Sequence, residues 1–231
     1  MKALNIPVGI SNFEKIRNNG FYYVDKTGLI EELLKTEAEV TLITRPRRFG
    51  KTLGMSMLES FFDIRKNSRK LFEGLEIARQ SELCSKWMNQ CPTVSVSFRQ
   101  VDGLNFTSAY DMLTMVFADL YNKHLYLLED SHVTEFQKKT FTNIAHGCGS
   151  EKEVKSSLVL LTTMMQQHYG KAVVLLIDEY DVPVAKANAH GYYNEMLDVM
   201  KGLLQALKDN QALENNLFVE SAIGDLDCFE V

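Results

Sequence analysis

The chain has 231 residues, 45% of them hydrophobic, which is enough for one α/β domain with a sizeable core. Its net charge of −5 argues against a general nucleic-acid coat, and no apolar run approaches the roughly 20 residues of a membrane helix. Residues 1–10 contain no signal-peptide core, and the four cysteines show no paired metal-ligand spacing. These features predict a single, reduced, cytoplasmic domain that does not bind a membrane.

The N-terminal segment, residues 1–39, predicts two short helices. Ser11, with a glutamate three residues later, is a capping-box pattern for the first helix, which Asn19-Gly20 ends. Asp25 or Thr27 can cap the second helix, because both side chains accept hydrogen bonds from backbone amides. The aromatic side chains of this segment suit core packing, with stacking on a nucleobase as the alternative. They are Phe13, Phe21, Tyr22 and Tyr23.

The next segment has the layout of a phosphate-binding loop. Val40–Thr44 is an apolar, β-branched run that predicts a buried strand, and residues 53–63 have apolar side chains at helical spacing. A basic loop ending in Gly-Lys-Thr joins the two. Gly50 lets the backbone and the first helical amides approach an anion. Lys51 supplies a charge for the β- and γ-phosphates, and Thr52 supplies a hydroxyl for Mg²⁺.

This loop departs from the standard pattern at one position. Arg45 stands where that pattern has a glycine, five residues before Gly50. The arginines clustered beside it predict a local anion site and not a broad basic face. The residues expected to contact the nucleotide are Arg45, Pro46, Arg47, Arg48, Phe49, Gly50, Lys51, Thr52 and Leu53.

The middle of the chain predicts one strand and two long helices. Residues 93–98 alternate and predict a strand, after which Arg99 or Gln100 faces the γ-phosphate or begins a surface loop. Ser108, three residues before an aspartate, has a capping-box-like spacing for a helix from residue 111 to about 128. Residues 138–149 are expected to form a polar, mobile stretch. Residues 150–170 then predict a helix with a capping box at its start and a glycine at its end.

An acidic motif follows a buried strand. Residues 173–177 are all apolar, as a central parallel strand with both faces covered requires. The strand leads directly into Asp178 and Glu179, and ligands bind at the carboxyl ends of strands in open α/β sheets. We expect Asp178 to hold Mg²⁺, directly or through water, and Glu179 to activate water as general base, with Lys51 as the other catalytic residue. The alternative is a strand that ends in a solvated acidic turn.

The last segment predicts a helix and a strand. Pro183 is expected to break the backbone pattern, and residues 185–191 are expected to form an exposed loop. From Tyr193 to Leu207 the apolar residues recur at helical spacing. Leu217–Ala222 predicts a further strand.

Several of these segments together resemble a known family. They are Ile6-Pro7-Val8-Gly9-Ile10, Phe13, Tyr23-Val24-Asp25-Lys26-Thr27, Thr44-Arg45-Pro46-Arg47-Arg48-Phe49-Gly50-Lys51-Thr52 and Ile177-Asp178-Glu179-Tyr180-Asp181. They are similar to the AAA-ATPase-like domain of bacterial proteins, which is often joined to a C-terminal PD-(D/E)XK-type nuclease-like domain. The resemblance covers residue 6 to about residue 210. In that family the arginine-rich run stands in for the glycine-rich loop, so Arg45 fits the family pattern.

The resemblance implies an α/β fold of the P-loop NTPase class with an additional strand, in which a mostly parallel sheet is flanked by helices. It implies that residues 40–222 form the nucleotide-binding core, that Mg²⁺ and ATP are the cofactors, and that Glu179 is the catalytic glutamate after the Mg²⁺ aspartate. The chain departs from the family at Glu220-Ser221, where relatives have Thr-Gly. Glu220 near the phosphates would repel them unless its side chain points away.

The C-terminal end shows a further departure. Residues 223–231 form a diverged tail, and no fifth core strand or nuclease-like domain follows, so we expect an incomplete sheet and a truncated or diverged protein. The expected function is Mg²⁺-dependent ATP hydrolysis that is slow or needs a protein partner or a second copy. The alternatives are a non-catalytic nucleotide-binding or regulatory module and a remnant of an ATPase–nuclease protein. A role with nucleic acid rests on the family analogy alone.

Overall fold

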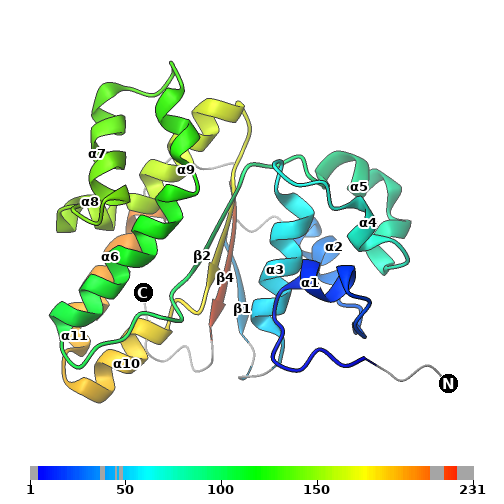
Figure 1. The fold of residues 1–231 in the computed structure, drawn as a ribbon, viewed down its shortest axis with the longest axis horizontal. Coiled ribbons are helices and arrows are strands. Elements are labelled where there is room, and N and C mark those ends of the chain that lie inside the picture. The colour runs from blue at the N-terminus through cyan, green and yellow to red at the C-terminus, as the bar shows by residue number, and fades with distance from the viewer. Residues whose placement is uncertain (1–4, 37–39, 45, 47–48, 209–215, 223–231) are drawn as a thin grey trace.

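The computed structural model describes residues 5–36, 40–44, 46, 49–208 and 216–222. In this part of the chain, four parallel strands form one sheet with helices on both faces (Figure 1). The strands are β1 (Val40–Thr44), β2 (Thr93–Ser97), β3 (Val174–Asp178) and β4 (Leu217–Ala222), and their order in the sheet is β1-β4-β3-β2. The predicted α/β class with a parallel sheet between helices is therefore confirmed.

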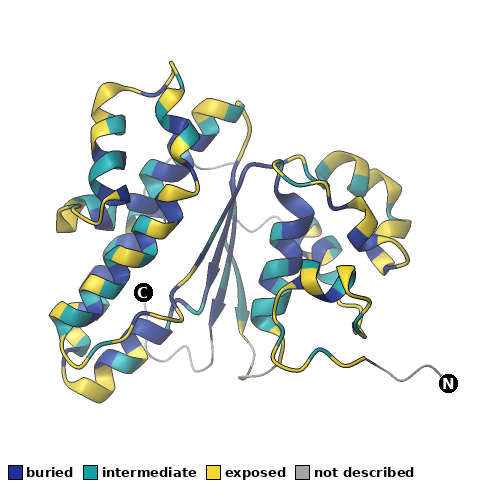
Figure 2. Cartoon of the chain, in the orientation of Figure 1, coloured by how far each residue is buried: buried dark blue, intermediate teal, exposed yellow. Residues whose placement is uncertain are grey.

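The helices form two layers, which lie on opposite sides of the sheet in Figure 1. One layer contains α1 (Phe13–Asn18), α2 (Gly28–Lys35), α3 (Lys51–Phe62), α4 (Arg69–Phe72), η1 (Glu76–Arg79) and α5 (Ser81–Trp87). The other contains α6 (Phe106–Asn122), η2 (Leu125–Glu129), α7 (Glu135–Ala145), α8 (Glu151–Lys155), α9 (Ser157–Tyr169), α10 (Val182–His190) and α11 (Tyr193–Lys208). Buried residues line the sheet and the helix faces turned toward it (Figure 2). Within the described residues, no helix is both long and apolar enough to cross a membrane.

The central strand β3 is buried along its whole length. Leu175 and Ile177 pack in the core beneath α6–α11, and Val174 and Leu176 pack in the core beneath α3. Because side chains alternate between the two faces of a strand, Asp178 lies on the α3 face. β3 thus carries the first acidic residue to the edge of the sheet at which α3 begins.

The placement of β4 is the feature that sequence patterns did not specify. β4 pairs with β1 on one side and with β3 on the other, so it separates the strand before the basic loop from the acidic strand. Leu42 of β1 and Ile177 of β3 both lie opposite Glu220. The order agrees with the additional strand that the resemblance implies, and it places the last residues of β4 next to the acidic motif.

Two predicted helix starts were wrong in detail. The N-cap of α1 is Asn12, one residue after Ser11, and its side chain accepts a hydrogen bond from the Lys15 amide at 2.7 Å. The N-cap of α6 is Asn105; Ser108 is the third helical residue and completes the capping box. Asn caps a helix as well as Ser does, and each segment contained both a serine and an asparagine that could serve as the N-cap. α6 ends at Asn122 and is followed by the separate η2.

Two predicted loops are helices. α7 occupies much of the stretch predicted to be mobile, because Phe141 and Ile144, three residues apart, are buried against the core. α10 occupies the second stretch, and Pro183 lies in its first turn, where the missing N–H needs no helical acceptor. The single helix predicted for residues 150–170 is two helices, α8 and α9, and Gly170 ends the second with φ +60°. α9 and α10 have weak helical periodicity, so tertiary packing determines their structure.

Asp25 ties the segment before α2 to η1. Its Oδ1 accepts hydrogen bonds from the Thr27 amide at 2.9 Å and the Thr27 hydroxyl at 2.7 Å, and its Oδ2 accepts one from the Glu76 amide at 2.7 Å. Thr27 is the N-cap of α2, yet its side chain makes no cap bond; it accepts instead from the Ile77 amide at 3.1 Å. Burial raises the pKa of Asp25, but these hydrogen bonds outweigh it and hold the pKa below the usual value.

We expect Asp25→Ala to lower the free energy of unfolding by about 0.5–1.5 kcal/mol, because the Thr27 and Glu76 amides exchange a carboxylate acceptor for water. The measurement is urea denaturation at pH 7, with Asp119→Ala in α6 as an exposed control. Since the folded-state pKa is lowered, the contribution is complete above about pH 4 and is lost as the pH falls through the folded-state value. Equal stability of Asp25→Ala and the wild type would contradict this role.

Candidate functional site

The first turn of α3 points toward the carboxyl edge of the sheet. Gly50 is the N-cap and has φ +79°, a left-handed conformation that a side chain would strain. The helix begins at Lys51, two residues earlier than predicted, so Lys51, Thr52 and Leu53 all lie in its first turn. Amides of a first turn have no acceptor within the helix, and they carry the positive end of the helix dipole. This end of α3 can bind an anion.

Asp178 is the last residue of β3 and is only 4% exposed. The hydroxyl of Ser221, in β4, donates a hydrogen bond to its Oδ1. Its Oδ2 is buried, and no hydrogen-bond donor reaches it from the described residues. A buried carboxylate oxygen without a donor is costly, and a bound cation removes that cost. Asp178 is therefore a candidate metal ligand on structural grounds as well as on its place in the sequence.

Glu179 follows Asp178 in an unusual backbone conformation. Its φ is +55°, and apart from Asn89 it is the one non-glycine residue with positive φ among those described. Its amide donates a hydrogen bond to the Ser221 hydroxyl oxygen at 3.2 Å, which holds the turn after β3 in place. Such strain persists only when surrounding contacts enforce it, and it is common at functional sites. Burial and the Asp178 carboxylate raise the pKa of Glu179 above its usual value.

One pocket of about 650 Å³ brings several predicted residues together. Lys51, Thr52 and Glu179 line it, and Pro46, Phe49, Gly50 and Leu53 complete the predicted nucleotide-binding residues that face it. Asp178 lies behind this lining, joined to it through Ser221 and Glu179. Arg45, Arg47 and Arg48 lie outside the described residues, so their predicted contacts stay predictions. A volume of this size falls within the roughly 300–1,000 Å³ typical of small-molecule sites.

The structure adds residues that sequence reasoning did not assign to the site. Ser221 joins Asp178 to Glu179, although the sequence showed it only as a departure from the family pattern. Lys186 also lines the pocket, beside Arg99, which the sequence already offered as a residue of the γ-phosphate side, and the Lys186 ammonium group donates to the Arg99 carbonyl at 3.3 Å. Lys186 was missed because its segment was predicted to be a loop. Lys186 could be identified as a lysine in the helix directly after the acidic motif, but only once α10 is known to be a helix.

Glu220 does not face the α3 side of the sheet. Its neighbours Val219 and Ser221 point toward α3: Val219 packs in that core, and Ser221 bonds Asp178. Because strand side chains alternate, Glu220 points to the other face, where it contributes to raising the pKa of Tyr180. The Glu220 carboxylate therefore points away from the start of α3, and it is not placed to repel phosphates bound there.

We expect Ser221→Ala to lower the free energy of unfolding by about 1–3 kcal/mol, because Asp178 and the Glu179 amide both lose a buried partner. Ser157→Ala is a matched control: Ser157 is equally buried, and its hydroxyl has no hydrogen-bond partner among the described residues. Urea denaturation at pH 7 measures both variants. The interpretation is wrong if Ser221→Ala is as stable as Ser157→Ala.

A parallel sheet, a helix N-terminus and a strand-end acidic pair at one edge define an α/β protein consistent with a P-loop-like fold. The chain belongs to the AAA-ATPase-like family, described as "Predicted AAA-ATPase", whose model matches residues 7–221. It is 27% identical over 214 residues to "Uncharacterized protein in vnfD 5'region" of Azotobacter chroococcum mcd 1. That match covers 92% of this chain and 36% of the relative, so the chain spans about a third of the relative's length. No solved structure matches the chain.

Proposed function

We propose that this chain is an ATP-binding P-loop domain that hydrolyses ATP with Mg²⁺. The observation that carries the proposal is the buried, unpartnered Oδ2 of Asp178 beside the constrained Glu179, at the edge of the sheet where α3 begins. Family membership supports ATP binding by a P-loop in general. The arrangement is the one that phosphoryl transfer needs, with an anion site and a base lining one pocket and a cation ligand directly behind them.

The residues of this site fit both ATP and Mg²⁺. The first-turn amides of α3 and the Lys51 ammonium group suit the phosphates, and Gly50 presents no Cβ to them. The Thr52 hydroxyl and the Asp178 carboxylate are hard oxygen ligands of the kind Mg²⁺ prefers. Bound Mg²⁺–ATP supplies the phosphoanhydride bond and a cation that neutralises charge developing on the phosphate oxygens.

Glu179 is proposed to accept the proton of the attacking water. Its raised pKa strengthens it as a base, while Lys51 and Arg99 lower the pKa in part and favour the charged form. The hydrogen bond from the Glu179 amide to the Ser221 hydroxyl holds the backbone at Glu179, which fixes the direction in which its side chain leaves the turn. Glu179 and Lys51 thus keep their proposed catalytic roles, the first as base and the second on the phosphates.

The alternative is a domain that binds nucleotide without turnover. Glu220 was the residue in the described chain that favoured it, and its place on the opposite face of β4 removes that support. We propose that turnover by this domain alone is slow or depends on a protein partner or a second copy, because some phosphoryl-transfer sites are completed by an arginine supplied in trans.

The test is ATP turnover by the purified chain with and without Mg²⁺, beside thermal unfolding with and without Mg²⁺–ATP. Turnover that requires Mg²⁺ supports hydrolysis. A rise in melting temperature without turnover, at any protein concentration, supports the nucleotide-binding alternative. Neither signal would reject nucleotide binding altogether.

A further inference from the structure

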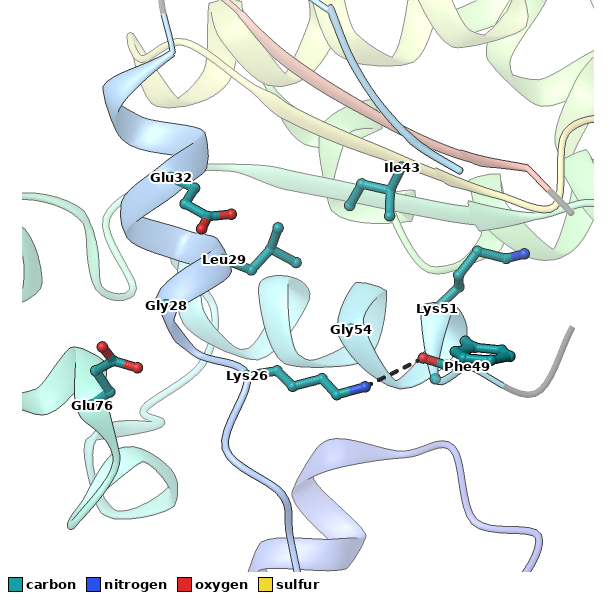
Figure 3. A pocket seen from close by; sticks show the side chains of 10 residues that line it. Lys26, Gly28, Leu29, Glu32, Ile43, Phe49, Lys51, Gly54 and Glu76 are labelled. Atoms are coloured by element: carbon teal, nitrogen blue, oxygen red, sulfur yellow. Dashed lines mark hydrogen bonds between the residues drawn. The ribbon is translucent and has the colours of Figure 1, made fainter. Parts of the chain in front are cut away.

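A second pocket adjoins the one that holds Glu179. It has a volume of about 270 Å³ and is lined by Leu29 of α2, Ile43 of β1 and Gly54 of α3. In Figure 3, Leu29 and Glu32 lie toward one end of this pocket, and Phe49 and Lys51 lie toward the other. Phe49, Gly50 and Lys51 line both pockets, so the two spaces meet at the start of α3.

The two pockets differ in chemistry. Four side chains with ionisable groups line the larger one, namely Lys51, Arg99, Glu179 and Lys186. Four ionisable side chains, Lys26, Glu32, Lys51 and Glu76, also line the smaller one, but all except Lys51 belong to exposed residues at its rim. Its walls are the apolar side chains of Leu29, Ile43 and Phe49. It is smaller than the roughly 300–1,000 Å³ that encloses a drug-sized ligand, so it suits one planar ring and not a whole nucleotide.

Gly54 makes the wall of this pocket that α3 contributes. It lies inside the helix, where glycine is less favourable than alanine. A Cβ at this position would meet no atom within 4 Å, so neither packing nor φ requires a glycine here. Because Gly54 has no Cβ, the helix backbone is exposed to the pocket opposite Leu29 and Ile43. A flat ring can lie against this stretch of backbone.

The mouth of the pocket is held in position. The Lys26 ammonium group donates to the Phe49 carbonyl at 3.4 Å, at the junction of the two pockets. The backbone next to Lys26 is held by Asp25, which accepts hydrogen bonds from the Thr27 and Glu76 amides. Phe49 itself is 58% exposed, and an exposed aromatic ring at the mouth of a pocket is suited to stacking on a base.

We propose that this second pocket binds the purine base of the nucleotide, with the ring between Leu29 and Gly54 and an exocyclic amino group directed to Glu32. The inference rests on the proposed function, because it takes the phosphates to lie at Lys51 in the adjoining pocket. A carboxylate only accepts hydrogen bonds, so Glu32 favours a base with an amino group over one with a carbonyl oxygen at the same place. The pocket therefore prefers ATP to inosine triphosphate.

The first experiment adds a side chain at Gly54 and so fills the pocket from the wall that α3 contributes. Gly54→Ala and Gly54→Leu are compared with the wild type for binding of Mg²⁺–ATP and of Mg²⁺–tripolyphosphate, which has no base. We expect Gly54→Ala to raise the melting temperature of the free protein by about 2–4 °C, because alanine favours the helix. Gly54→Leu is expected to weaken ATP binding about 10-fold or more and to leave tripolyphosphate binding unchanged. Gly54→Ala, whose Cβ meets no atom within 4 Å, is the control that changes the helix without filling the pocket.

The second experiment tests the amino group. Glu32→Gln can donate as well as accept, so the preference for ATP over inosine triphosphate is expected to disappear in this variant. Glu31→Gln, the neighbouring residue of α2 that pairs with Lys35, makes the same charge change and should keep the preference.

The outcomes separate the inference from the function on which it rests. If the wild type binds neither ATP nor tripolyphosphate, the proposed function and this inference both fail. If it binds both, and Gly54→Leu binds ATP as tightly as the wild type, the base lies elsewhere and only the inference is overturned. Selective loss of ATP binding in Gly54→Leu, with the free protein still folded, supports the base pocket.

Discussion

Glu179→Gln is expected to bind Mg²⁺–ATP as well as the wild type and to hydrolyse it about 100- to 10,000-fold more slowly. The amide is nearly the same size as the carboxylate but cannot take a proton from water. Affinity should not fall, because the substitution removes a negative charge from beside Asp178 and the phosphates. Binding is measured by calorimetry, and the chemical step by single-turnover hydrolysis.

The matched control for this variant is Glu220→Gln. Glu220 also lies near the end of a central strand, but it faces the opposite side of the sheet from Asp178 and α3. The control should hydrolyse ATP at the wild-type rate. The assignment of Glu179 as base is wrong if both variants keep full activity, and the site itself is in question if both lose it.

The raised pKa of Glu179 adds a second expectation for the same residue. A general base acts in its deprotonated form, so turnover should rise with pH as Glu179 loses its proton. Burial and the Asp178 charge move this rise above the ordinary glutamate pKa of about 4.3. Glu179→Gln should lack this acidic limb, which distinguishes it from acid unfolding, since unfolding affects both proteins.

The strands and the two motifs were readable from sequence because their physical requirements are local. A parallel strand covered on both faces needs a nearly continuous apolar run, and β3 has one. β1 and β4 have the bounds that were predicted, and Gly50 is the residue at which a left-handed turn is required. The same local rules predicted the helix after Gly50, with an error of two residues at its start.

The rest of the site depends on pairing between distant segments. Ser221 meets Asp178 only because β4 enters the sheet between β1 and β3, and no local pattern specifies that order. The same order turns Glu220 to the far face, which the sequence left open. α10 carries Lys186 to the pocket, but the sequence predicts a loop there, because this helix is stabilised by burial of Val184 and Ala187 and not by periodicity.

Lys51→Ala is expected to weaken Mg²⁺–ATP binding about 10- to 100-fold, because hydrogen bonds to charged groups contribute about 1.5–3 kcal/mol. Lys51 lines both pockets, in the first turn of the helix whose amides face the same space. Its loss should weaken ATP and tripolyphosphate equally, since the ammonium group acts on the phosphates. Gly54→Leu should weaken binding of ATP but not of tripolyphosphate. The two variants thus distinguish the contribution of the phosphates from that of the base.

Lys171→Ala is the control for the change of charge. Lys171 is exposed just before β3, at the opposite edge of the sheet, where its ammonium group donates to the Gln90 carbonyl at 3.1 Å. The Lys171→Ala substitution removes the same unit of charge at a distance from α3. A general electrostatic effect on ATP binding would therefore appear in both variants, more strongly at low salt. Unchanged affinity in Lys51→Ala would mean that phosphate does not bind at the start of α3. The roles of Thr52 and Asp178 would then lose their basis, because both depend on an anion at that place.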